Sequence, residues 1–238
     1  MKAVKRLGIF AILMVAGAMT AGAEEKVETT VSADAVSQYI WRGQELGGIS
    51  LQPTLEVSYA GFSVNAWGSV GLESTDTKEF DITVGYSLGG FNIGITDYWF
   101  NQGGGDESNR YFMYHSHRTN HVFEANIGYD CGKGAIQWYT NFAGNDGLNK
   151  SGKRAYSSYV ELTAPFALGG ADWTAAIGAV PYASTFYSTN GFAVTNVSLT
   201  ASKDIQITPS FSLPVFAQVA ANPASQKAYF VFGFTLKP

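Results

Sequence analysis

Hydrophobic and polar residues alternate along the segment Ser50–Gly71, and the same pattern recurs along most of the chain. In its first half, apolar residues from Leu51 to Tyr59 fill every second position, and after Ala60-Gly61 the alternation restarts. A period of two gives each strand one apolar and one polar face. In a soluble β-sandwich the apolar face looks inward, whereas in an outer-membrane barrel it faces lipid and the polar face lines the lumen. The strand pattern alone does not separate these two folds.

The connections between the expected strands do separate them. The chain divides into about twelve strands of roughly 9–13 residues, close to the length of a tilted transmembrane strand. The first strand is expected over Val31–Arg42, followed by a loop over Gln44–Ile49, and a late turn is expected at Asp204-Ile205. Even-numbered connections are tight turns such as Gly89-Gly90, while odd-numbered ones are longer, up to Asn101–Asn120. Because outer-membrane barrels sort their loops in this way, we predict an all-β fold: a membrane-spanning antiparallel up-and-down β-barrel of about twelve strands.

The first residues have the composition of a targeting signal. A basic start precedes the apolar run Leu7–Met19, and Ala21-Gly22-Ala23 has the small-residue pattern of a cleavage site. The apolar run is shorter than the about 20 residues of a spanning helix. We therefore predict a cleaved signal peptide over residues 1–23 and a single barrel domain over residues 24–238.

Composition narrows the class of protein further. Charged residues make up 14% of the chain, against roughly 25% in soluble domains. A net charge of -4 without a Lys/Arg cluster argues against nucleic acid as a partner, and Cys131 has no second cysteine with which to form a disulfide. Several aromatic residues near expected strand ends are predicted interfacial anchors: Trp41, Tyr98, Trp99, Trp138 and Tyr156.

Several short segments resemble a known family. YIWRG (Tyr39–Gly43), the following LQPTLEVSY and GFSVNAWGS, FDITVGYS (Phe80–Ser87) and VSLTASKDI (Val197–Ile205) are similar to stations of the TorF-type (Gcw_chp-like) family of proposed outer-membrane porins. The resemblance spans most of the chain after residue 23, and it implies a twelve-stranded outer-membrane barrel with a role in transport. The chain departs from the family pattern in its enlarged His-bearing loop and in its end, Lys237-Pro238 instead of an aromatic residue.

Charged residues on the predicted polar faces are the candidate site. They are Arg42, Glu56, Asp81, Glu124 and Glu161, assigned to the first, second, fourth, sixth and eighth strands. One interpretation is structural, since charges in a lumen are costly unless paired, and Arg42 would then brace the wall by pairing with one or two of the acids. The other is a selectivity constriction, which would prefer cations because four acids face one arginine.

Three histidines offer a weaker candidate for metal binding. His115, His117 and His121 form a His-Ser-His-x-x-x-His pattern, and alternate residues of an extended chain point the same way. No cysteine or second cluster supports this, so we predict no metal and no cofactor. A hydrolytic site would need a nucleophile signature, which the nearby Ser108 and Ser116 lack, and we predict that the protein is not an enzyme.

The pattern favours a narrow porin for passive passage of small polar solutes or ions. Twelve strands lie between the eight that side chains fill and the sixteen that leave a wide channel, and loop Asn101–Asn120 could close the pore. The alternative is a non-conducting structural or ligand-binding barrel that acts through its external loops. The expected partners are outer-membrane lipid, the barrel-assembly machinery and the solutes themselves. A monomer with both termini in the periplasm is expected.

Overall fold

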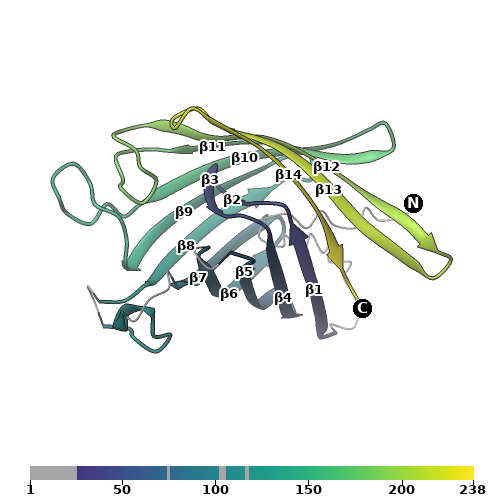
Figure 1. The fold of residues 1–238 in the computed structure, drawn as a ribbon, viewed down its shortest axis with the longest axis horizontal. Helices are drawn as coiled ribbons and strands as arrows, with labels where there is room; N and C mark the ends of the chain where they lie inside the picture. The colour runs from purple at the N-terminus through teal and green to yellow at the C-terminus, as the bar shows by residue number, and fades with distance from the viewer. Residues whose placement is uncertain (1–25, 74–75, 102–105, 116–117) are drawn as a thin grey trace.

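Twelve antiparallel strands close into a barrel in the computed structural model, which describes residues 26–73, 76–101, 106–115 and 118–238 (Figure 1). The predicted signal peptide lies outside the described residues. The barrel strands are β1 (Glu28–Val36), β4 (Ser50–Tyr59), β5 (Phe62–Gly71), β6 (Lys78–Leu88), β7 (Phe91–Asn101), β8 (His121–Asp130), β9 (Ala135–Gly144), β10 (Ser158–Leu168), β11 (Ala171–Val180), β12 (Ala193–Thr208), β13 (Phe211–Asn222) and β14 (Lys227–Leu236). Each strand pairs with its neighbours in chain order, and β1 closes the barrel by pairing with both β4 and β14. The predicted fold class is confirmed.

The polar face of the strands looks into the barrel. In β4, the buried side chains are Ser50, Gln52 and Glu56, and the residues between them are mostly exposed and apolar. Apolar side chains on the other strands are likewise exposed around the circumference: Val64, Val84, Ile93, Ile127, Ile136, Leu162, Ile177 and Val219. A water-soluble sandwich would bury this face. The barrel therefore has an apolar exterior and a polar interior.

Loop length follows the predicted parity. The turns after β4, β6, β10 and β12 have two residues each, and they lie at the end of the barrel where β1 begins and β14 finishes. The opposite end, called here the loop end, carries the longer connections, including residues 145–157 and 181–192. The turn between β12 and β13 is at Pro209-Ser210, so the turn expected at Asp204-Ile205 is wrong. Alternation continues through that dipeptide, and the proline, which lacks an N–H for the ladder, ends the strand instead.

The first expected strand is also wrong in part. β1 ends at Val36, and the chain then forms a separate two-stranded hairpin, β2 (Tyr39–Trp41) and β3 (Gln44–Gly47). Figure 1 shows this hairpin turned inward from the wall between β1 and β4. Its side chains Tyr39 and Trp41 are buried against inward-facing residues of the barrel strands. Arg42 is therefore carried on a hairpin inside the lumen and not on a barrel strand.

The seam that closes the barrel is short. β1 and β14 are paired over only four positions, from Ala33 opposite Leu236 to Val36 opposite Gly233. β14 begins at Lys227, so its first residues extend beyond the last paired position of β1. The chain leaves the wall at this point to form the hairpin.

One short helical turn occurs in the described part of the long loop, a 3₁₀ turn over Glu107–Asn109. Among the described residues, no helix is long and apolar enough to cross a membrane.

Candidate functional site in the lumen

Arg42 lies at the tip of the β2–β3 hairpin because two successive residues adopt left-handed backbone conformations. Arg42 has φ 50° and Gly43 has φ 77°, as in the tight two-residue turns that favour Gly at the second position. The Gly43 position also approaches the wall closely, since a Cβ atom there would lie 1.8 Å from the carbonyl oxygen of Thr195 on β12. On the same side, the Asn222 side-chain amide donates to the Gly43 carbonyl at 3.0 Å. The hairpin tip is thus fitted against β12 and β13.

The Arg42 side chain joins the hairpin to the far wall. Its guanidinium donates to both carboxylate oxygens of Glu124 on β8, at 2.6 and 2.9 Å, and to the Tyr187 hydroxyl at 2.6 Å. The Tyr98 hydroxyl donates to the same carboxylate at 2.9 Å. The Arg42 and Glu124 side chains are only 7% and 2% exposed. Such bidentate pairs are directional as well as strong.

Aromatic rings surround the ion pair. The Arg42 guanidinium carbon lies 3.9 Å from the ring centroid of Tyr139, 4.3 Å from that of Trp41 and 4.8 Å from that of Tyr159. These separations are within the range of cation–π attraction. Burial disfavours the charged guanidinium, but the neighbouring Glu124 carboxylate and Tyr187 outweigh it and raise the pKa of Arg42 well above its ordinary value. The guanidinium stays charged in its aromatic enclosure.

The other predicted acids also face the lumen but do not contact Arg42. Glu161 on β10 accepts from the Tyr159 hydroxyl at 2.7 Å and from the Asn196 amide at 3.4 Å. Glu56 on β4 accepts from the Asn65 amide at 3.4 Å, and Asp81 is buried on β6. Of the four acids, the structure brings only Glu124 to Arg42.

Glu79 is a lumen acid that the candidate set left out. It lies two positions before Asp81 on the same face of β6 and accepts from the Tyr39 hydroxyl of the hairpin at 2.8 Å. Its place in the alternation was a sufficient signal, because residues two apart on a strand share a face. With Glu124 and Glu79, the hairpin is bonded to two acids of the barrel wall.

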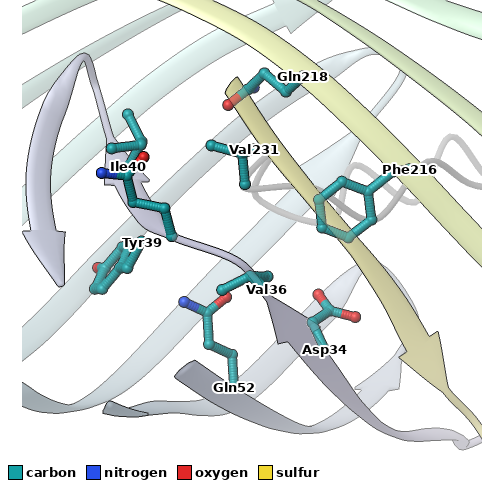
Figure 2. A pocket seen from close by; sticks show the side chains of 9 residues that line it. Asp34, Val36, Tyr39, Ile40, Gln52, Phe216, Gln218 and Val231 are labelled. Atoms are coloured by element: carbon teal, nitrogen blue, oxygen red, sulfur yellow. The ribbon is translucent and has the colours of Figure 1, made fainter. Parts of the chain in front are cut away.

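A small cavity lies at the root of the hairpin (Figure 2). Its volume of about 20 Å³ is enough for roughly one water molecule. The lining side chains come from β1, β2, β4, β13, β14 and the bend between β1 and β2, and they are Asp34, Val36, Gln38, Tyr39, Ile40, Gln52, Phe216, Gln218 and Val231. Three of them, Val36, Phe216 and Val231, form an apolar cluster against which Ile40 packs.

The described part of the long loop packs on the outside of the barrel and not in the lumen. The Tyr111 ring contacts Phe80 and Trp99, two side chains on the outer face, with centroid separations of 5.7 and 5.4 Å. His121, also on this face, bonds Asp97 through Nδ1 at 2.7 Å and the Tyr111 carbonyl through Nε2 at 2.6 Å. For these residues the expected closure of the pore by this loop is wrong, and the β2–β3 hairpin occupies the lumen instead.

The same contacts bear on the histidine candidate. His121 is completely buried, with both ring nitrogens engaged by the protein. His115 lies in the described part of the loop, and His117 is outside the described residues. Within the described ranges, no group of three or more His, Cys, Asp or Glu side chains is arranged to hold a metal ion.

Two of the aromatic residues predicted to be interfacial anchors lie inside the barrel instead. Trp41 and Tyr98 belong to the buried cluster in the lumen, packed edge to face with ring centroids 5.8 Å apart. Both face inward, Trp41 because the hairpin bends and Tyr98 because it shares a face with Thr96. Trp138 and Tyr156 are exposed, at 40% and 53%, as an interfacial role requires.

A family model described as bacterial protein of unknown function (Gcw_chp) matches residues 20–230. The chain belongs to this family. No curated protein sequence matches the chain.

Three solved structures are similar in outline. An outer membrane channel from Pseudomonas putida F1 has 13% identity and a TM-score of 0.44, over 91% of this chain and 98% of that one. The outer membrane protein opdK from Pseudomonas aeruginosa has 15% identity and a TM-score of 0.37, over 88% of this chain and 61% of that one. Salmonella typhi OmpF, in complex with daunomycin, has 9% identity and a TM-score of 0.37, over 90% of this chain and 98% of that one.

Proposed function

We propose that this protein is an outer-membrane β-barrel that passes small polar solutes or ions through a narrow lumen restricted by the β2–β3 hairpin. One observation carries the proposal: the closed barrel exposes apolar side chains around its circumference and buries polar ones inside. Closure gives each of the twelve strands a partner on both sides, which leaves few backbone groups for a bilayer to desolvate, and the inverted polarity is the signature of transmembrane barrels. The proposed role requires no catalysis and no cofactor.

The orientation and the partners are proposed from general features of outer-membrane barrels. Short turns lie on the periplasmic side in outer-membrane barrels, and here they share an end with the start of β1 and the finish of β14. We therefore place both termini in the periplasm and the loop end outside. Outer-membrane lipid would cover the apolar face, and the barrel-assembly machinery would insert the chain, with Phe230, Phe232 and Phe234 on the outer face of β14. We assign a monomer.

Charge in the lumen supports a preference for cations. Glu56, Glu79, Asp81 and Glu161 face inward without contacting Arg42, whose charge is balanced by Glu124. Rings of acidic side chains favour cations in other channels. The hairpin and its aromatic enclosure limit the passage to small species.

Single-channel recording of refolded residues 24–238 in planar bilayers tests the proposal. We expect small discrete steps with a reversal potential that favours K⁺ over Cl⁻. The Arg42→Ala variant should raise the conductance and the cation preference, because it removes the positively charged guanidinium from the lumen and loosens the hairpin. A folded barrel that gives no steps under any voltage, with either sequence, would contradict the proposed function.

A hollow between two loops at the loop end favours a second candidate function. The loops over residues 145–157 and 181–192 form an open hollow of about 500 Å³, lined by residues that include Lys150, Tyr182 and Phe192. A barrel with a closed lumen would bind a ligand there and conduct nothing. Silent bilayers together with ligand binding that is lost in the Tyr182→Ala variant would select this alternative.

A further inference from the structure

The first pair of the β2–β3 hairpin keeps the register of the β1–β4 hairpin, and the register then shifts by one residue between Tyr39 and Ile40. The last β1–β4 pair is Val36 with Ser50, and three residues further along each strand Tyr39 pairs with Gly47. Between these pairs the chain bends twice, at Ser37-Gln38 and at Gly48-Ile49. The lumen hairpin is thus the loop-end part of the β1–β4 hairpin, folded inward (Figure 2).

Both bends are hydrogen-bonded to the barrel, the first to β14 and the second to the loop between β5 and β6. At the first, the Ser37 N–H donates to the Phe232 carbonyl at 2.9 Å, and the Phe232 N–H donates to the Ser37 hydroxyl at 3.0 Å. At the second, the Leu72 N–H donates to the Ile49 carbonyl at 2.9 Å, and the Gly48 N–H donates to the Asp76 carboxylate at 3.2 Å. These contacts fix two pivots on opposite sides of the hairpin, while the hairpin itself lies free of strand pairing with the barrel.

The wall has an open edge beside the first pivot. In β14, residues 227–231 pair with β13, but over the described chain no strand pairs with them on the β1 side. An unpaired strand edge that faces lipid is costly because its N–H and C=O groups have no water. Extending the β1–β14 register past Val36 and Gly233 places Tyr39 opposite Phe230 and Trp41 opposite Ala228.

The alternation of β2 fits this edge. Residues paired across a ladder face the same side of the sheet, and Phe230 is on the outer face, 63% exposed. On the wall, Tyr39 and Trp41 would therefore face outward at the loop end, where barrels carry their aromatic girdle. Arg42, one position further, would still face the lumen.

We propose that the β2–β3 hairpin is a hinged gate with two positions, called here the lumen seat and the wall seat. In the lumen seat described here, Arg42 is held by Glu124 and Tyr39 by Glu79. In the wall seat, the hairpin swings about Ser37-Gln38 and Gly48-Ile49, β2 pairs with the open edge of β14, and the lumen is cleared. This regulation rests on the proposed function, but the movement is measurable without conduction.

Cysteine cross-linking in lipid vesicles tests the second seat. On a Cys131→Ser background, the pair Tyr39→Cys with Phe230→Cys should form a disulfide under mild oxidation, because paired residues of a ladder lie within reach of the bond. In the lumen seat Tyr39 faces inward and is 2% exposed while Phe230 faces outward, so the disulfide requires the swing. The matched control, Tyr39→Cys with Phe234→Cys, uses an outward-facing residue of β14 that pairs with Ala35, four positions before Tyr39, and it should not link in either seat. Equal yields for this pair and its control would overturn the gate.

A second pair in the same register guards against misfolding. Trp41→Cys with Ala228→Cys should also link, and heat-modifiable electrophoretic migration shows for each variant whether the barrel has folded. Failure of both pairs in folded barrels would overturn the gate as well.

Recording from the cross-linked protein separates the gate from the channel. Minor conformations are typically populated to about 10% or less, so locking the wall seat should raise the open probability by at least about tenfold, and reduction should reverse the change. Linked barrels that stay silent would show that the hairpin swings but that the lumen does not conduct. Conducting barrels that never link would keep the channel and overturn the gate.

Discussion

Both carboxylate oxygens of Glu124 bind the guanidinium of Arg42, at 2.6 and 2.9 Å, across the lumen of the barrel. The two residues are 82 positions apart in the chain, and their contact joins the tip of the inner hairpin to β8. Because both side chains are almost completely buried, neither charge is compensated by solvent when the other is removed. This ion pair is the main charged link between hairpin and wall.

Replacing Glu124 with Gln should release the hairpin without unfolding the barrel. Breaking a buried ion pair from one side costs about 3–5 kcal/mol, so trypsin should cleave after Arg42 in the folded variant and not in the parent. The matched control is Glu45→Gln, because the contacts of Glu45 with Gln38, at 2.7 Å, and with Lys227, at 3.7 Å, are exposed, and exposed ion pairs contribute up to about 1 kcal/mol. Equal cleavage rates in the two variants would contradict the role of Glu124.

Gly43→Ala should also displace the hairpin. The new Cβ atom would lie 1.8 Å from the Thr195 carbonyl oxygen, so the tip has to move away from β12. Gly132→Ala is a close control, since Gly132 has nearly the same φ, 76°, but no atom within 4 Å of the added Cβ. Both variants carry a backbone strain of about 1–2 kcal/mol, and only Gly43→Ala should raise the single-channel conductance. A rise of the same size in Gly132→Ala would show that the effect is strain alone.

Leu55→Arg should impair insertion into vesicles. Leu55 lies at mid-strand on the outer face, where a charged side chain in lipid costs about 2–4 kcal/mol. Leu148 has the same exposure, 48% against 49% for Leu55, but lies in the loop between β9 and β10. Urea midpoints of the vesicle-folded proteins should therefore fall for Leu55→Arg and stay within error for Leu148→Arg. Equal midpoints would argue against a membrane around β4.

His121→Ala should loosen the long loop and leave conduction unchanged. The substitution removes the contacts with Asp97 and with the Tyr111 carbonyl, so trypsin should cleave faster at the exposed Arg110. Because the described part of this loop packs on the outer face, the conductance and its selectivity should match the parent. A change in conductance would place the loop in the conduction path.

Much of the barrel could be predicted because its determinants are local. Alternation with a period of two marks the strands and the faces that point inward, and glycine pairs such as Gly89-Gly90 mark the tight turns. The parity of loop length then selects a barrel over a sandwich. A turn at Pro209-Ser210 was missed because alternation runs unbroken through Asp204-Ile205, and the proline carried the only local sign of the turn.

The inner hairpin could not be predicted because its determinants are distant. Tyr39 and Trp41 continue the alternation of β1, and that pattern is the same whether the strand stays in the wall or bends inward. The bend depends on contacts with Glu79 and Glu124, which lie far along the chain. The polar faces identified five lumen residues, but only the strand register decides which acid meets Arg42.

The short β1–β14 seam has a consequence for how the chain folds. The hairpin pairs residues that are close in sequence, such as Tyr39 and Gly47, whereas the seam joins Ala33 with Leu236 from opposite ends of the chain. Local pairs form before distant ones because they close shorter loops. The hairpin therefore pairs before the cylinder is complete, and the last strand has to dock beside it and bond the first bend through Phe232. Substitutions at the two bends should slow this final step of assembly, even where the finished barrel is equally stable.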